Sequence, residues 1–268
     1  MNNSAENPED FGNNEQPNLP VQPSQPNEPK QRFSLLEVIQ YGFNGVFVNS
    51  SVWLVLSVCV VFALLSLVVF SIAMGLSNYD PAGVAPSATQ TNPGWMIFFF
   101  ITFMVMFLFI SVFYCATALK QTREQPVTLQ TLFQGIPYGV AVPVVLIRFL
   151  VYVVLQSIPY FVTGVGVVGL LGTLIAFASV FIEPFLTYAP FFALDGNDGV
   201  VGSIKRGIAF GKEHYGFLIL YTLISATMIG VSALMCYLPL IVVLPAVILG
   251  QAAIYEQLAH GRALSIQR

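Results

Sequence analysis

Long apolar stretches without any charged residue recur along this chain. Residues 51–75 and 95–119 each run for 25 positions without an Asp, Glu, Lys or Arg. An α-helix rises about 1.5 Å per residue, so about 20 apolar residues cross the roughly 30 Å hydrocarbon core of a bilayer. Each stretch is therefore predicted to form one transmembrane helix.

Two further apolar blocks are too long for a single span. Residues 138–194 and 217–258 each suit two spans, with breaks near Pro159 and at Cys236–Pro239. The whole chain is 56% hydrophobic and 9% charged, whereas soluble domains carry about 25% charged residues. We therefore predict an all-α, polytopic membrane protein whose six transmembrane helices form three hairpins. Nucleic acid is not expected as a partner.

The basic residues predict the orientation of these spans. Lys and Arg near span ends favour the cytoplasmic side, and six spans place nine of the ten on one side. We therefore expect a multi-pass protein of the cytoplasmic (inner) membrane with both termini in the cytoplasm. The nine residues are Lys30, Arg32, Lys120, Arg123, Lys205, Arg206, Lys212, Arg262 and Arg268. Membrane lipids are the expected partners, with inner-leaflet contacts at Lys120, Arg123, Lys205, Arg206 and Lys212.

The first 32 residues differ in composition from the rest. They are rich in Asn, Gln, Glu and Pro, and such a segment buries too little apolar surface to offset the entropy of ordering. We expect residues 1–32 to form a disordered cytoplasmic tail without a cleavable secretory signal, and residues 33–268 to form the membrane domain. The prolines at every third position from Pro17 to Pro29 suit a polyproline II spacer or, alternatively, a ligand for an aromatic groove.

A short amphipathic segment precedes each predicted pair of spans. The three segments are Phe33–Phe43, Val127–Ile136 and Gly199–Phe210, and Ser34 with Glu37 fits a capping box at the start of the first. They predict three copies of one unit, in which a cytoplasmic helix lies on the inner leaflet before a membrane hairpin. Alternatively, any loop that enters a membrane tends to be amphipathic. In the third segment the predicted apolar stripe is Val201, Ile204 and Ile208.

Several motifs of soluble sites occur in contexts that do not suit them. Gly164–Gly169 matches the dinucleotide pattern GxGxxG, but it lies inside an apolar block rather than between a soluble strand and a helix. Asp195–Gly199 lacks the distal glutamate of a calcium loop, and Asp198 is better interpreted as a helix cap. His214 and His260 have no partner at metal-ligand spacing. We expect no catalytic residue, metal or cofactor.

Two charged residues lie near the middle of predicted spans. Arg148 and Glu183 are each about 10 residues from the inner end of their span, which places both near the midplane. Because a charge at that depth is costly, we expect them to pair. The pair is interpreted either as a structural link or as a polar site for an ion, a proton or a lipid headgroup. The i, i+4, i+8 spacing predicts two polar stripes, which are Arg148, Tyr152 and Gln156 on one helix and Ser179, Glu183 and Thr187 on the other.

The passage "TYAPFFALDGNDGVVGSIKRGIAFGKEHYGFLILY", followed later by "AAIYEQLAHG", resembles a bacterial family of six-span membrane proteins. This family is related to the membrane domain fused to some glycerophosphoryl diester phosphodiesterases, and a Pro-rich tail ahead of it looks actinobacterial. The resemblance implies a six-span domain over about residues 33–268 without the soluble barrel that carries the phosphodiesterase. It supplies no catalytic residue.

These features predict a non-enzymatic membrane protein. We expect an envelope-related, accessory or scaffold role, with other membrane or envelope proteins contacted through the Pro-rich tail and the cytoplasmic helices. The alternative is a transporter or lipid-handling protein that uses the stripe around Arg148 and Glu183.

Overall fold

Helices make up all the regular secondary structure in the described part of the chain, which confirms the predicted all-α class. The computed structural model describes residues 34–77, 93–125, 127–162, 178–196, 198–235 and 238–262, all in one compact unit. The predicted Pro-rich tail and the glycine motif at 164–169 lie outside these residues. The helices are α1 (Leu35–Val48), α2 (Ser50–Ser77), α3 (Pro93–Thr122), α4 (Tyr138–Val162), α6 (Ala189–Asp195), α7 (Gly199–Glu213), α8 (Tyr215–Leu234) and α9 (Leu240–His260), and residues 178–186 are also helical.

Four helices are long and apolar enough to cross a membrane. They comprise Ile97–Thr122, Tyr138–Leu155, Tyr215–Leu234 and Leu240–His260. A fifth candidate combines Leu35–Val48 with Ser50–Ala63, which meet at an angle of 98°. These helices are compatible with a membrane-embedded protein. The four unbroken candidates overlap predicted spans, whereas the bent pair joins the first predicted amphipathic segment to part of the span predicted at 51–75.

The first predicted amphipathic segment is helical. It forms α1, and the predicted capping box is present, with the Ser34 backbone N–H donating to Glu37 Oε2 at 3.2 Å. The chain turns sharply at Asn49, so α1 and α2 lie nearly perpendicular. Such a bend suits a helix on the membrane surface that leads into a span.

The prediction of a second amphipathic helix is wrong. Residues 129–135 form consecutive turns, in which Leu132 N donates to Thr128 O at 3.0 Å and Gln134 N to Thr131 O at 3.2 Å. Gly135 has φ +69° and Pro137 follows it, so a helix starting in this short segment could not continue. The apolar spacing alone therefore misled the prediction.

The third predicted segment is helical, but its predicted apolar stripe is not its buried face. α7 buries Ser203, Gly207, Phe210 and Gly211, while Val201 stays 66% exposed. A Cβ on Gly207 would come within 2.9 Å of Ala189, and one on Gly211 within 2.6 Å of the Pro184 carbonyl oxygen. Small residues thus let α7 pack closely against residues 184–189.

The fourth predicted span is interrupted near its inner end. Helical residues 178–186 give way to a bend at Thr187 and Tyr188, after which α6 starts with Pro190 in its first turn. Proline has no N–H to donate and disfavours helical geometry before it. The short α6 packs against α3, α4 and α7.

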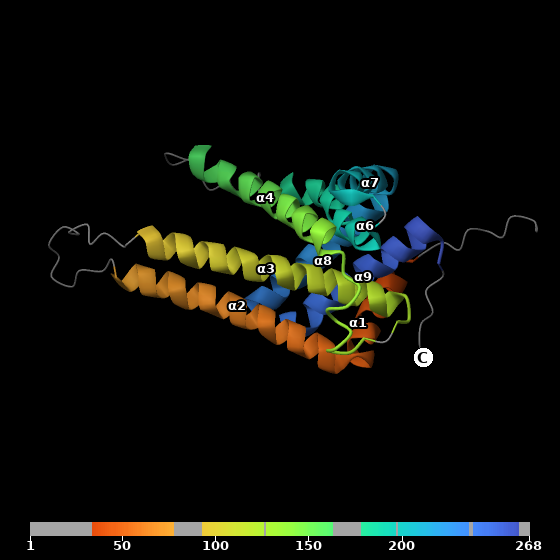
Figure 1. Ribbon diagram of the computed structural model, residues 1–268, viewed down its shortest axis with the longest axis horizontal. Helices are drawn as coiled ribbons and strands as arrows, with labels where there is room; N and C mark the ends of the chain where they lie inside the picture. The colour runs from red at the N-terminus through yellow and green to blue at the C-terminus, as the bar shows by residue number, and fades with distance from the viewer. Residues whose placement is uncertain are drawn as a thin grey trace, which may run out of the picture. The chain divides into compact units, whose positions relative to one another are not determined.

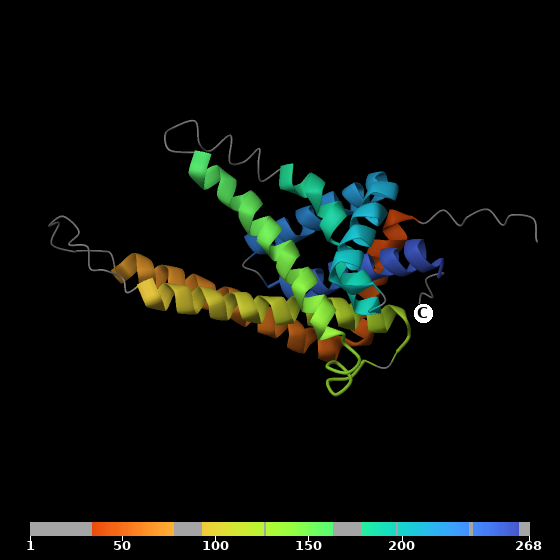
Figure 2. The same cartoon turned by 45° about the horizontal axis from the view of Figure 1, so that its top comes forward.

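α9 is the central helix of the unit. Of the most apolar stretch of α9, 61% is buried, whereas 22% or less is buried in the corresponding stretches of the other three unbroken candidates. α9 contacts α1, α2, α3 and α8. α2 and α3 lie side by side and antiparallel (Figures 1 and 2). α9 packs more extensively against α1 and α3 than against α8, so sequential pairing alone does not describe the packing.

A second apolar core joins α3, α4 and α6. Val112, Ala116, Val144 and Ala193 belong to its buried residues. Ile136 also packs here, so the turns before α4 are anchored to the helices. This core fixes the C-terminal half of α3 beside α6.

Candidate functional site

The structure brings Arg148 and Glu183 together. Arg148 Nη2 donates to Glu183 Oε1 at 2.7 Å, and Thr187 Oγ1 donates to the same oxygen at 2.8 Å. The Arg148 and Glu183 side chains are 25% and 19% exposed. The carboxylate therefore has one partner from α4 and one from the bend that follows its own helix, as expected for a charge predicted to lie within the membrane.

The remaining residues of the two predicted stripes differ in their contacts and burial. The Arg148 guanidinium lies 5.9 Å from the centroid of the Tyr152 ring, within cation–π range. The buried Tyr152 hydroxyl has no hydrogen-bond partner among the described residues. Ser179 is buried on the opposite helix, and the side chain of Gln156 lies outside the described residues.

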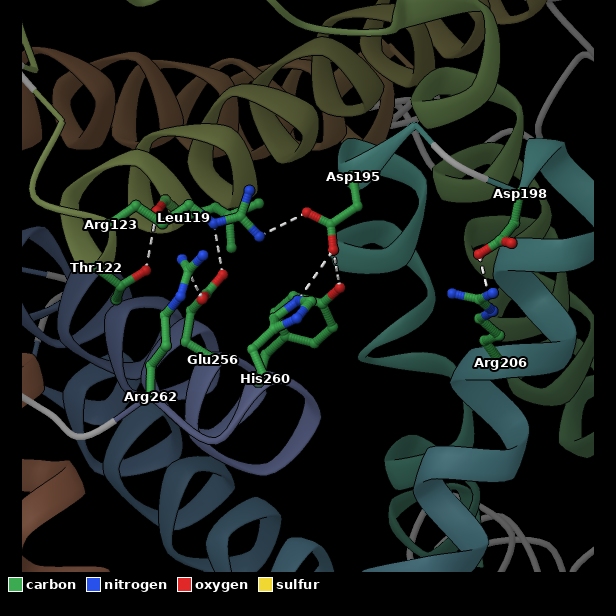
Figure 3. Close-up of polar contacts among 10 residues, drawn as sticks. Leu119, Thr122, Arg123, Asp195, Asp198, Arg206, Glu256, His260 and Arg262 are labelled. Atoms are coloured by element: carbon green, nitrogen blue, oxygen red, sulfur yellow. Dashed lines mark hydrogen bonds and ion pairs between the residues drawn. The ribbon is translucent and has the colours of Figure 1, made fainter. Parts of the chain in front are cut away.

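A larger charged cluster lies at the ends of α3, α6 and α9. Arg123 Nη2 donates to Asp195 Oδ1 and Arg123 Nε donates to Glu256 Oε1, both at 2.6 Å (Figure 3). Asp195 is the last residue of α6, and Glu256 lies in the last two turns of α9. We call this group the inner-end cluster, after the predicted inner ends of the spans beside it; its members are Arg123, Asp195, Tyr255, Glu256, His260 and Arg262.

Both carboxylates of the inner-end cluster have further partners. Glu256 is 2% exposed and accepts from Arg262 Nη1 at 2.9 Å. Asp195 Oδ2 accepts from the Tyr255 hydroxyl. The same oxygen lies 3.3 Å from His260 Nε2 (Figure 3). The two carboxylates and the two guanidinium groups balance in charge, which offsets the cost of burying Glu256.

The environment of Arg123 keeps it charged. Burial by itself lowers the pKa of its guanidinium, but the hydrogen bonds that Arg123 donates to Asp195 and Glu256, together with their negative charges, raise that pKa above the ordinary value. Arg123 was expected to contact lipid headgroups. In the structure Arg123 pairs with two carboxylates and so joins the ends of α3, α6 and α9.

The other basic residues expected at the inner leaflet divide into two groups. Lys120 Nζ donates to the carbonyl oxygens of Thr131 and Gln134, both at 2.6 Å, so it closes the turns before α4. Arg206 Nε pairs with Asp198 Oδ2 at 2.9 Å (Figure 3). Asp198 occupies the predicted cap position of α7 but makes no side-chain capping bond. Lys205 and Lys212 are exposed.

Sequence reasoning missed most of the inner-end cluster. Asp195 was interpreted as part of a turn, His260 as an isolated interfacial histidine, and Glu256 was not singled out. The available signal is depth, because all three lie near inner span ends, where Arg123 and Arg262 were already placed. Residues of opposite charge at one depth are candidates for pairing.

A pocket of about 160 Å³ lies beside this cluster, between the end of α3 and the turns before α4. Lys120, Arg123, Gln125 and Gly135 line it together with apolar residues. Among the described residues no three His, Cys, Asp or Glu side chains are arranged to hold a metal ion. The chemistry that this part of the chain offers is therefore charge pairing and hydrogen bonding by Arg, Lys and carboxylates.

No family model, curated protein or solved structure matches this chain. The resemblance to the membrane domain of glycerophosphoryl diester phosphodiesterases stays a prediction.

Proposed function

We propose that this chain is a non-enzymatic, six-span protein of the cytoplasmic membrane with an accessory or scaffold role in the cell envelope. The observation that supports this is that charged side chains within the helices and at their ends pair with one another. Arg148 pairs with Glu183 at 2.7 Å, and Arg123 pairs with Asp195 and Glu256 at 2.6 Å. Charged side chains that bind one another hold helices in place, as a scaffold requires.

The proposed topology adds two spans to the four unbroken candidates. One is α2 after the bend at Asn49, and the other comprises the helical residues 178–186 with the segment before them. Both termini and α7 then lie on the cytoplasmic side, in agreement with the distribution of Lys and Arg. Val201 on α7 and Phe47 on α1 are 66% and 67% exposed, which suits helices resting on the inner leaflet.

Cysteine labelling on intact cells tests this topology. In a variant lacking Cys59, Cys115 and Cys236, a membrane-impermeant thiol reagent should label Ser87→Cys before lysis and Lys205→Cys only after lysis. Labelling of Lys205→Cys on intact cells would overturn the proposed orientation.

The scaffold role predicts protein partners on the cytoplasmic side. Residues 1–32 and the exposed surfaces of α1 and α7 are the proposed contacts. The experiment crosslinks proteins in cells and then purifies either the full chain or a chain lacking residues 1–32. The proteins recovered with each chain are compared. The same membrane or envelope proteins should be recovered repeatedly with the full chain, and fewer with the shortened one. Recovery of lipids alone with both chains would contradict a scaffold role.

A transporter or lipid-handling protein is the second candidate. The partial exposure of Arg148 and Glu183 favours it, together with the Tyr152 hydroxyl that lacks a partner among the described residues. A translocation path would bring water to Tyr152. A single cysteine in place of Tyr152 should therefore react with an impermeant thiol reagent if a path exists, and should stay unlabelled from both sides if the pair only links helices.

A further inference from the structure

Two cations line the pocket at the end of α3, and among the described residues Arg123 is paired with carboxylates whereas Lys120 is not. Its polar lining comes from Lys120, Arg123, Gln125 and Gly135, and Ile136 and Leu194 close its apolar side. Two of these residues are cations, and no acidic side chain lines the pocket. A small cavity with this lining suits an anion.

Lys120 has unused capacity as a hydrogen-bond donor. Its ammonium group donates to the Thr131 and Gln134 carbonyl oxygens, and an ammonium group has three N–H bonds. No carboxylate among the described residues lies within ion-pair distance of it. Neutral carbonyl groups fix the position of Lys120 but leave its charge uncompensated, so an anion in the pocket would be stabilised.

Arg123 lines the same pocket and has donors that its carboxylate partners do not use. Its Nε and Nη2 are used by Glu256 and Asp195, which leaves the Nη1 N–H groups for a ligand. The two carboxylates hold the guanidinium in a fixed position, so a ligand would not have to order it. Rigid N–H donors of Arg suit phosphate oxygens in particular.

The size of the pocket limits what it can take. At about 160 Å³ it lies below the roughly 300–1,000 Å³ of most small-molecule sites. One small anionic group fits this volume better than a nucleotide or a whole lipid. Its apolar side at Ile136 and Leu194 continues into the core of α3, α4 and α6.

We infer that this pocket binds a phosphate group through Lys120 and the free donors of Arg123. The phosphate can belong to an anionic phospholipid headgroup or to a phosphate ion in solution, because the same donors recognise both. The lipid source rests on the proposed function, which places this end of α3 at the cytoplasmic leaflet. Binding itself depends only on the pocket.

The test compares the full chain, purified in neutral detergent, with two variants by thermal unfolding. Gln125→Glu places a negative charge on an exposed residue of the pocket wall and removes none of the contacts described above. Lys205→Gln removes an exposed basic charge outside the pocket and is the matched control. The ligands are short-chain phosphatidylglycerol, short-chain phosphatidylcholine, and sodium phosphate against sodium chloride of equal ionic strength.

Phosphatidylglycerol should raise the unfolding temperature of the wild type and of Lys205→Gln. Phosphatidylcholine should raise it much less, because its own quaternary ammonium group neutralises the charge of its phosphate. In Gln125→Glu the concentration needed for half of this effect should rise about fivefold, since one charge at a membrane surface is worth about that factor. If sodium phosphate stabilises and phosphatidylglycerol does not, the site is supported and its ligand is the ion in solution.

Two results would overturn the site. One is the absence of stabilisation by either phosphate source, and the other is an equal response of the wild type and both variants. An equal loss in Gln125→Glu and Lys205→Gln would also overturn it, since that indicates diffuse charge attraction. Failure of the proposed orientation in the labelling experiment would leave phosphate binding in detergent unchanged, so the two ideas fail separately.

Discussion

The hydroxyl of Ser57 donates a hydrogen bond of 2.8 Å to the backbone carbonyl of Ile241. Pro245 lies four residues after Ile241 in α9, and its nitrogen carries no hydrogen for that carbonyl. Ser57, which is 2% exposed in α2, therefore satisfies the acceptor that the proline leaves unpaired. The same hydroxyl lies 3.1 Å from the Tyr114 hydroxyl, so α2, α3 and α9 meet at one polar point.

Substitution of Ser57 by Ala should weaken this contact. The Ile241 carbonyl loses its partner in a buried place, so the free energy of unfolding should fall by about 1 kcal/mol. Unfolding by sodium dodecyl sulfate in mixed micelles measures it. Ser66→Ala is the control, because the Ser66 hydroxyl bonds only to the Ala63 carbonyl of its own helix. An equal effect of both substitutions would contradict the role of Ser57.

Gly42 allows α1 to approach α9 closely. A Cβ at this position would overlap the Ala246 carbonyl oxygen, so Gly42→Ala should push the two helices apart and cost about 1–3 kcal/mol of stability. The same unfolding assay compares it with Gly139→Ala, where the added Cβ meets no atom within 4 Å. Gly139→Ala should leave stability unchanged or raise it slightly. Tolerance of alanine at Gly42 would show that α1 does not pack as described.

Glu256 is the most deeply buried charge of the inner-end cluster. Its replacement by Gln leaves Arg123 with only Asp195 and removes the partner of Arg262. The variant should lose about 1–3 kcal/mol of stability, since the Arg123 and Arg262 guanidinium groups lose a charged acceptor and the buried amide replaces it with one neutral oxygen. Glu213→Gln, at a residue with a 76% exposed side chain, should change it by less than about 0.5 kcal/mol. Similar unfolding curves for both variants would argue against the cluster.

The sequence was sufficient to predict two features that a membrane requires, which are long uncharged helices and a partner for a charge within a span. Uncharged stretches of sufficient length indicated the helices, and a charge near the midplane needs a partner, which identified Glu183 for Arg148. Arg123, Asp195 and Glu256 lie at span ends, where water or lipid headgroups could serve them, so their spacing in the sequence does not predict pairing. Their contacts depend on how α3, α6 and α9 pack.

Local patterns were less informative about the short elements. The segment before α4 has helical apolar spacing but forms turns, since Gly135 and Pro137 limit it and Lys120 binds its carbonyl groups. In α7 the small residues Gly207 and Gly211 are buried while the larger Val201 is exposed. Backbone constraints decide the first case and close helix packing decides the second, and the spacing of apolar residues encodes neither.

The central claim is that paired charges within the helices and at their ends link the helices to one another. Reversal of the Arg148–Glu183 pair tests this claim most directly. Arg148→Glu and Glu183→Arg should each place two like charges together and lower the yield of folded, monodisperse protein in mild detergent at least about tenfold, since each leaves an unpaired charge at depth costing about 2.5–3.5 kcal/mol. The double variant restores opposite charges and should recover most of that yield. A double variant as poorly folded as the single ones, or single variants that fold normally, would contradict the account.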